Sequence, residues 1–198
     1  LRAALDKAMR PASALDVIFA GDLLNQCIAS SFAARGQKVP FLGLYGACST
    51  MAESLVLAAM AIDGGFASLT ASVASSHFCS AERQYRTPLE YGGQRTPTAQ
   101  WTVTGSGAVV LSQDGEGPWI THATIGRGVD KGVKDANNMG AAMAPAAYDT
   151  LTAHFADTGR RPSDYDLIVT GDLGSLGLEL LQDLFHMDGV EFSNLDDC

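Results

Sequence analysis

The chain contains the same eight-residue phrase twice, at residues 16–23 and at residues 166–173, and five of the eight positions are identical at an offset of 150 residues. An Arg-Pro pair precedes each copy, and each copy has the pattern of a helix, a Pro-containing turn, a buried apolar strand and a second helix. A repeated unit of this kind predicts a duplicated fold. Because strands and helices alternate along the chain, we expect parallel sheets with helices on both faces.

A strand, a tight turn and a helix are predicted in succession over residues 39–63. An apolar run ends at Tyr45, small residues follow, and a helical pattern begins near Ser49 or Thr50. Glu53 stands three residues after Thr50, as in a capping box. The turn therefore places Cys48 at or next to a helix N-terminus, where unpaired N–H groups and the helix dipole favour a thiolate or a bound anion.

Two functions suit Cys48, a nucleophilic cysteine or the floor of an anion-binding pocket formed with Ser49 and Thr50. The alternative is a small cysteine that merely packs in a crowded turn, and the residues alone favour that alternative. Further strands are predicted at residues 68–75, 102–112 and 120–125, and a helix at residues 141–155. The polar stretch between residues 76 and 100 is long enough to suggest a functional loop or a lid.

Ser76 and His77 follow a predicted strand directly, and ligands gather at the carboxyl ends of strands in open parallel sheets. His77 could act there as a base or as a hydrogen-bond donor, although an ordinary loop histidine is the more probable interpretation from spacing alone. Arg83 and Arg86 lie in the long polar stretch and could bind a carboxylate through their guanidinium groups. Ordinary surface arginines explain them equally well.

Charge and cysteine spacing exclude several classes of protein. The formal net charge is −9, and the 13 Lys and Arg residues are scattered singly, which argues against a nucleic-acid binder. No apolar run reaches the roughly 18 residues that a membrane-spanning helix needs. The four cysteines have neither metal-ligand spacing nor a nearby His pair, so we predict no metal site, no cofactor and no disulfide framework. Leu1 at the start and the abrupt end at Cys198 lead us to expect an excerpt of a longer chain.

Several motifs resemble the thiolase and ketoacyl-synthase superfamily and, within it, the stage V sporulation protein AD family. The resemblance extends over essentially the whole chain. It rests on the Gly-Ala-Cys-Ser-Thr turn, the internal duplication and longer motifs at residues 19–27, 44–50, 75–78, 90–95, 105–111 and 134–140.

This resemblance implies an α/β thiolase-like fold of five layers with internal duplication, divided into an N-terminal half at residues 1–114 and a C-terminal half at residues 115–198. It also implies a protein of endospore-forming bacteria that binds dipicolinic acid (pyridine-2,6-dicarboxylate) during its uptake into the forespore. The implied partners are the other proteins of the same operon at the spore inner membrane, where this chain would associate peripherally. Superfamily resemblance further implies a homodimer.

The resemblance places Cys48 at the position of the superfamily's nucleophile. Condensing enzymes carry a catalytic His in a turn after the repeated strand, whereas the corresponding residues here are Gly171 and Asp172. A missing catalytic group typically costs several powers of ten in rate, so we expect binding without catalysis. The predicted ligand-binding residues are Cys48, Ser49, Thr50, Ser76, His77, Arg83 and Arg86. The alternatives are an active acyl-CoA acyltransferase with Cys48 as nucleophile and a structural adaptor that binds no small molecule.

Overall fold

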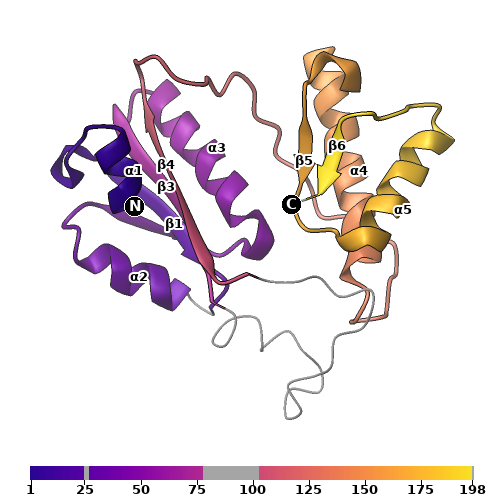
Figure 1. The fold of residues 1–198 in the computed structure, drawn as a ribbon, viewed down its shortest axis with the longest axis horizontal. Helices are drawn as coiled ribbons and strands as arrows, with labels where there is room; N and C mark the ends of the chain where they lie inside the picture. The colour runs from indigo at the N-terminus through magenta and orange to yellow at the C-terminus, as the bar shows by residue number, and fades with distance from the viewer. Residues whose placement is uncertain (25–26, 78–102, 198) are drawn as a thin grey trace, which may run out of the picture. The chain divides into compact units, whose positions relative to one another are not determined.

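A computed structural model describes residues 1–24, 27–77 and 103–197 of the chain (Figure 1). These residues form two compact units. Residues 1–77 and 103–120 belong to the first unit, and residues 121–197 belong to the second. The predicted division into thiolase-like halves at residues 1–114 and 115–198 stays a prediction. None of the helices in the described parts of the chain is both long and apolar enough to cross a bilayer.

A four-stranded sheet forms the centre of the first unit, with strand order β2-β1-β3-β4. The strands are β1 (Val17–Asp22), β2 (Phe41–Leu44), β3 (Leu69–Ser76) and β4 (Gly105–Ser112). β1 runs parallel to β2 and β3, as the alternation of elements predicts. β4 is antiparallel to β3, with Leu69 opposite Ser112, so the expectation of purely parallel sheets is wrong at this strand. Mixed sheets of this kind are common, because an antiparallel edge strand can complete an otherwise parallel sheet.

Helices cover both faces of this sheet because side chains alternate along β1. Ile18 and Ala20 of β1 pack with Leu5 of α1 (Arg2–Lys7) on one face. Phe19 packs with Ala58 of α3 (Thr50–Asp63) on the other face. Figure 1 shows α3 on one side of the sheet, with α1 and α2 (Ile28–Arg35) on the opposite side.

The second unit consists of two packed helices and a short sheet. α4 (Met139–Thr158) and α5 (Gly174–Met187) enclose a core of Ala144, Leu173, Leu181 and Phe185. β5 (Ile168–Thr170) pairs in parallel with β6 (Leu195–Asp197). Where α4 passes α5, Gly140 and Gly177 touch through their backbones, and a Cβ on Gly140 would lie 2.9 Å from the Cα of Gly177.

The repeated phrase has the same local structure in both units. A 3₁₀ turn, at Ala12–Ala14 or Pro162–Asp164, precedes the strand by a few residues. The strand then pairs in parallel with the strand that follows the next helix, with Ile18 opposite Phe41 and Ile168 opposite Leu195. The internal duplication predicted from the sequence is therefore present at the level of secondary structure.

The strand predicted at residues 120–125 is wrong, because these residues form neither helix nor strand. A strand needs a hydrogen-bonded neighbour. In the described part of the second unit, β5 and β6 pair only with each other, and no ladder reaches residues 120–125. The apolar residues of this segment are partly exposed, including Ile120 and Ile125.

Candidate functional site

The turn between β2 and α3 is tightly packed around Gly46. A Cβ on Gly46 would lie 2.5 Å from Oε2 of Glu53 and 2.6 Å from Oγ of Ser49, so any larger residue here would displace both side-chain ends. Ala47 has φ of +50°, a left-handed conformation that costs a non-glycine residue about 1–2 kcal/mol. A 3₁₀ turn over Ala47–Ser49 then leads into α3, which begins at Thr50.

The helix start predicted near Ser49 or Thr50 is confirmed, but the predicted capping box does not form. Ser49 is the N-cap residue of α3, and no side chain caps the helix. The Ser49 hydroxyl instead donates to the carbonyl oxygen of Gly46 at 2.7 Å. The Glu53 carboxylate lies against Gly46, where it adds negative charge to the first turn of the helix.

The structure separates the three predicted residues of this turn by their exposure. Cys48 and Ser49 are exposed. Thr50 is only 2% exposed, and its methyl group packs on the backbone of Gly21 in β1, where a Cβ would lie 2.7 Å from Cγ2. The Thr50 hydroxyl is buried and has no hydrogen-bond partner in the structure. A buried hydroxyl without a partner typically costs about 1–3 kcal/mol, so this group calls for an explanation.

Ser76 has the same property at the end of the neighbouring strand. It is the last residue of β3, and its Oγ is also buried with no hydrogen-bond partner among the described parts of the chain. Because side chains alternate along a strand, Ser76 shares the face of Phe19 and Ser72, which is the face that α3 covers. Thr50 sits over Gly21, and Gly21 aligns with Ala74 of β3, two residues before Ser76. Two unpartnered hydroxyls therefore lie on the α3 face toward the carboxyl ends of β1 and β3.

The remaining predicted site residues lie outside this pair. His77 follows Ser76 directly and is exposed. Arg83 and Arg86 lie outside the described residues. The structure therefore adds no observation on a cationic contribution from these two arginines.

Sequence reasoning missed a row of hydroxyls on β3. Thr70 and Ser72 are both 0% exposed, and their hydroxyls, like that of Ser76, have no hydrogen-bond partner in the structure. Thr70, Ser72 and Ser76 share one face of β3, because their positions differ by even numbers of residues. That polar alternation was the signal in the sequence, since a buried strand face is ordinarily apolar.

A second polar cluster lies on the opposite face of the same sheet, around Asp22 at the end of β1. The Asp22 carboxylate is 3% exposed and accepts hydrogen bonds from the Leu24 amide, the Ser30 amide and the Ser30 hydroxyl, at 2.9, 2.8 and 2.6 Å. The buried Cys27 thiol donates to the Leu44 carbonyl oxygen at 2.7 Å. Burial raises the pKa of the Cys27 thiol, and the charges of Asp22 and Glu53 raise it further. Cys27 is therefore a protonated packing residue at neutral pH.

The turn after β5 in the second unit corresponds to the turn after β1 and is built in the same way. Asp172 accepts a hydrogen bond from the Gly174 amide at 3.0 Å, as Asp22 does from the Leu24 amide two residues on. Asp172 thus organises the turn into α5 at the position where condensing enzymes are expected to carry a histidine. Among the described residues, no cluster of three or more His, Cys, Asp or Glu side chains has the arrangement of a metal site.

Solved structures with a similar fold include a 3-oxoacyl-[acyl-carrier-protein] synthase and a condensing enzyme. The chain superposes over its full length on 3-oxoacyl-[acyl-carrier-protein] synthase III from Aquifex aeolicus, with a TM-score of 0.67, 15% identity and coverage of 66% of that enzyme. It superposes equally over its full length on the tetronic acid condensing enzyme AbyA1, with a TM-score of 0.66, 15% identity and coverage of 68%. At these identities the likeness establishes the fold, which is thiolase-like.

Sequence comparison gives the family. The chain is 49% identical over 185 residues to stage V sporulation protein AD of Bacillus subtilis (strain 168), a match that covers 93% of the chain. The same match covers 55% of the Bacillus subtilis protein, so the chain spans about half the length of that relative. The family model for stage V sporulation protein AD matches residues 1–198. The chain therefore belongs to the stage V sporulation protein AD family.

Proposed function

We propose that this protein is a non-catalytic member of the thiolase fold that binds dipicolinic acid for its uptake into the developing spore. Membership of a sporulation family at 49% identity to a stage V protein supports the cellular role. The observation that carries the binding role is the pair of buried, unpartnered hydroxyls at Thr50 and Ser76. The Gly171-Asp172 turn supports the absence of catalysis, since an ionised carboxylate cannot donate a hydrogen bond to a developing oxyanion as an imidazole N–H can.

Pyridine-2,6-dicarboxylate is a small planar dianion whose four carboxylate oxygens accept hydrogen bonds. Hydroxyls donate to carboxylates, and the N-terminus of α3 adds backbone N–H groups and a positive dipole end. A ligand carboxylate near Thr50 and Ser76 would give each buried hydroxyl a partner. Cys48, Ser49 and His77 would contact the ligand from the exposed side of these hydroxyls, and Arg83 or Arg86 would supply the positive charge that an acidic chain needs to hold a dianion.

Isothermal titration of the full-length protein with dipicolinate tests this proposal. We expect saturable binding that weakens about tenfold in Thr50→Val and in Ser76→Ala, because each removes one hydrogen bond to a charged group. Thr70→Val is the matched control, since Thr70 also has a buried, unpartnered hydroxyl on the same face of β3 but lies at the other end of that strand.

The control variant should bind with unchanged affinity. Isophthalate, which has the same two carboxylates without the ring nitrogen, reports how far binding depends on the pyridine ring. Equal affinities in Thr50→Val, Ser76→Ala and Thr70→Val would place the ligand elsewhere. The lack of any saturable binding by the wild-type protein, with assembly on its membrane partners retained, would favour a structural adaptor.

An active acyltransferase is the second candidate function. The exposure of Cys48 at the turn before α3 and the condensing-enzyme fold favour it. Incubation with acetyl-CoA followed by peptide mass mapping distinguishes the two candidates. Stoichiometric acylation of Cys48 would support catalysis, whereas an unmodified Cys48 with intact dipicolinate binding is the outcome that our proposal expects.

The proposed partners are a second copy of the chain and the other proteins of the stage V A operon at the spore inner membrane. Peripheral association with that membrane would follow from these protein contacts. Analytical ultracentrifugation of the full-length protein tests the homodimer, and co-purification from sporulating cells tests the operon partners. A monomer at micromolar concentration, or purification without any of those proteins, would contradict the corresponding proposal.

A further inference from the structure

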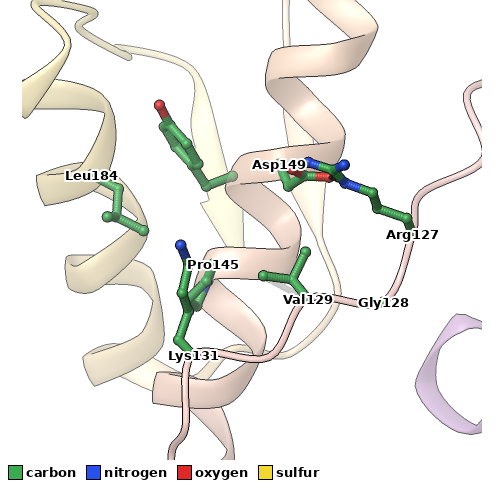
Figure 2. A pocket seen from close by; sticks show the side chains of 8 residues that line it. Arg127, Gly128, Val129, Lys131, Pro145, Asp149 and Leu184 are labelled. Carbon is green, nitrogen blue, oxygen red and sulfur yellow. Dashed lines mark hydrogen bonds and ion pairs between the residues drawn. The ribbon is translucent and has the colours of Figure 1, made fainter.

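The second unit contains a pocket that lies apart in the chain from every residue of the proposed dipicolinate site. Its volume is about 400 Å³, and it is lined by residues 127–129, by Lys131, by α4 and by Leu184 of α5. Figure 2 shows Lys131, Pro145 and Leu184 on one side of this pocket and the pair of Arg127 and Asp149 on the other. Small-molecule sites in proteins typically have volumes of about 300–1,000 Å³.

The segment that forms one wall of the pocket is fixed to α4 by side-chain contacts. Thr124 shares a hydrogen bond of 2.8 Å with Nδ1 of His154. Gly126 lies so close to the Thr150 hydroxyl that a Cβ would clash with it. Arg127 then binds Asp149 through Nε and Nη2 at 3.0 and 2.7 Å. Successive contacts with α4 thus hold this segment, although it forms neither helix nor strand.

The lining of the pocket combines positive charge with an apolar surface. Arg127 and Lys131 are two cations, whereas Asp149 is the one carboxylate, so the lining carries one excess positive charge. The hydrogen bond from Arg127 holds the pKa of Asp149 below its ordinary value, and the charge of Lys131 contributes in the same direction. Val129, Pro145 and Leu184 supply the apolar walls.

We propose that this pocket binds a small monocarboxylate with a compact apolar body. The Lys131 ammonium pairs with the ligand carboxylate as a point charge. Arg127, on the other side of the pocket, is held by Asp149 through Nε and Nη2 and contributes its positive charge to the lining. The apolar body packs against Val129, Pro145 and Leu184. One excess positive charge matches one carboxylate, so a dianion is disfavoured relative to a monoanion.

Titration of the full-length protein with 4-fluorobenzoate, followed by fluorine NMR, tests the proposal. For a ligand of this size we expect a Kd of the order of 1 mM. Lys131→Gln should weaken binding about tenfold, because it removes the excess charge. Lys134→Gln is the matched control, since Lys134 is exposed on the same segment and does not line the pocket.

Three results overturn the proposal. They are equal affinities in Lys131→Gln and Lys134→Gln, equally tight binding of 4-fluorobenzylamine, and the absence of saturable binding up to about 10 mM. The last result would also be expected if the pocket received an acidic side chain of a protein partner. The Thr50→Val and Ser76→Ala variants should bind 4-fluorobenzoate normally, so this test can fail or succeed independently of the dipicolinate site.

Discussion

Glu53 brings a carboxylate to the end of α3 that an anionic ligand would approach, since its Oε2 lies against Gly46. We predict that Glu53→Gln increases the affinity for dipicolinate about two- to fivefold, because it removes a like charge at a helix N-terminus. The same change should accelerate alkylation of Cys48 by iodoacetamide at pH 7, measured by peptide mass mapping. The buried Cys27 should stay unmodified in both proteins, since its raised pKa and burial protect it.

Glu116→Gln serves as the matched control, because Glu116 is an exposed acidic residue of the first unit outside this turn. It should leave both the affinity and the alkylation rate unchanged. Equal dipicolinate affinities and equal Cys48 alkylation rates in Glu53→Gln and Glu116→Gln would show that the charge of Glu53 affects neither ligand binding nor the reactivity of Cys48.

Asp16 makes the stability of the first unit depend on pH. Its carboxylate accepts hydrogen bonds from the Leu69 amide at 3.0 Å and the Ser68 amide at 2.7 Å, and these bonds lower the pKa of Asp16 below 3.8. A depressed folded-state pKa stabilises the protein above the unfolded-state pKa, and this stabilisation is lost as the pH falls through the folded-state pKa. We predict that Asp16→Asn lowers Tm at pH 7 and that the difference from wild type vanishes in strong acid.

Asp166 occupies the corresponding position of the second repeat and is exposed like Asp16, but within the described residues no backbone amide donates to its carboxylate as the Ser68 and Leu69 amides do to Asp16. Asp166→Asn should therefore change Tm less than Asp16→Asn at pH 7 in differential scanning calorimetry. A Tm difference for Asp16→Asn that is independent of pH would exclude the carboxylate as its cause.

At the scale of elements, the crossing of α4 and α5 depends on two glycines. A Cβ on Gly177 would lie 2.8 Å from the Cα of Gly140, and a Cβ on Gly140 would lie 2.5 Å from the Leu173 carbonyl oxygen. We predict that Gly140→Ala and Gly177→Ala each destabilise the protein by about 1–3 kcal/mol, since the helices must move apart. Urea denaturation measures the change.

Gly171→Ala provides the control for this crossing, because nothing lies within 4 Å of a Cβ at Gly171. It should change the free energy of unfolding by less than about 1 kcal/mol. A stability of Gly140→Ala equal to that of Gly171→Ala would mean that the helices are not held as closely as the structure shows.

The elements that sequence reasoning predicted correctly are those whose pattern is set by their own residues. α3 begins at Thr50 and ends at Asp63 as predicted, because small residues, an apolar periodicity and a Gly-Gly stop mark its ends. Whether β4 runs parallel or antiparallel to β3, and whether residues 120–125 form a strand, depends on which segments pair with one another. A local sequence pattern carries no information about this pairing.

The same distinction holds for the candidate site. The sequence placed Thr50 and Ser76 at the ends of adjacent elements, and the structure shows both on the face of the sheet that α3 covers. Their missing hydrogen-bond partners could not be predicted, because satisfaction of a hydroxyl depends on every atom packed around it. The capping box failed for a related reason, since the Glu53 carboxylate lies beside Gly46 without a capping hydrogen bond and the Ser49 hydroxyl donates to the Gly46 carbonyl oxygen.

At the scale of the whole chain, the two repeats give a direct comparison of the same turn in two settings. Asp22 accepts three hydrogen bonds and is buried, whereas the Asp172 carboxylate accepts from the Gly174 amide in a turn that is less buried. We predict that Asp22→Asn destabilises the protein by about 2 kcal/mol, since hydrogen bonds to a charged acceptor are lost or weakened. Asp172→Asn should cost less than about 1 kcal/mol in the same urea denaturation experiment. Equal costs would show that burial of Asp22 adds nothing to its role.

The carboxylate of Asp172 also couples two effects of one substitution at this turn. A substitution to histidine at this position would introduce an imidazole where condensing enzymes are expected to have one, but it would also remove the oxygen that binds the Gly174 amide. Asp172→His would thus loosen the entry to α5 in the same step that introduces the imidazole. The gain of a proton-transfer group and the loss of a turn contact are therefore tied to one position, and a second, compensating change in the turn would be needed to obtain the first without the second.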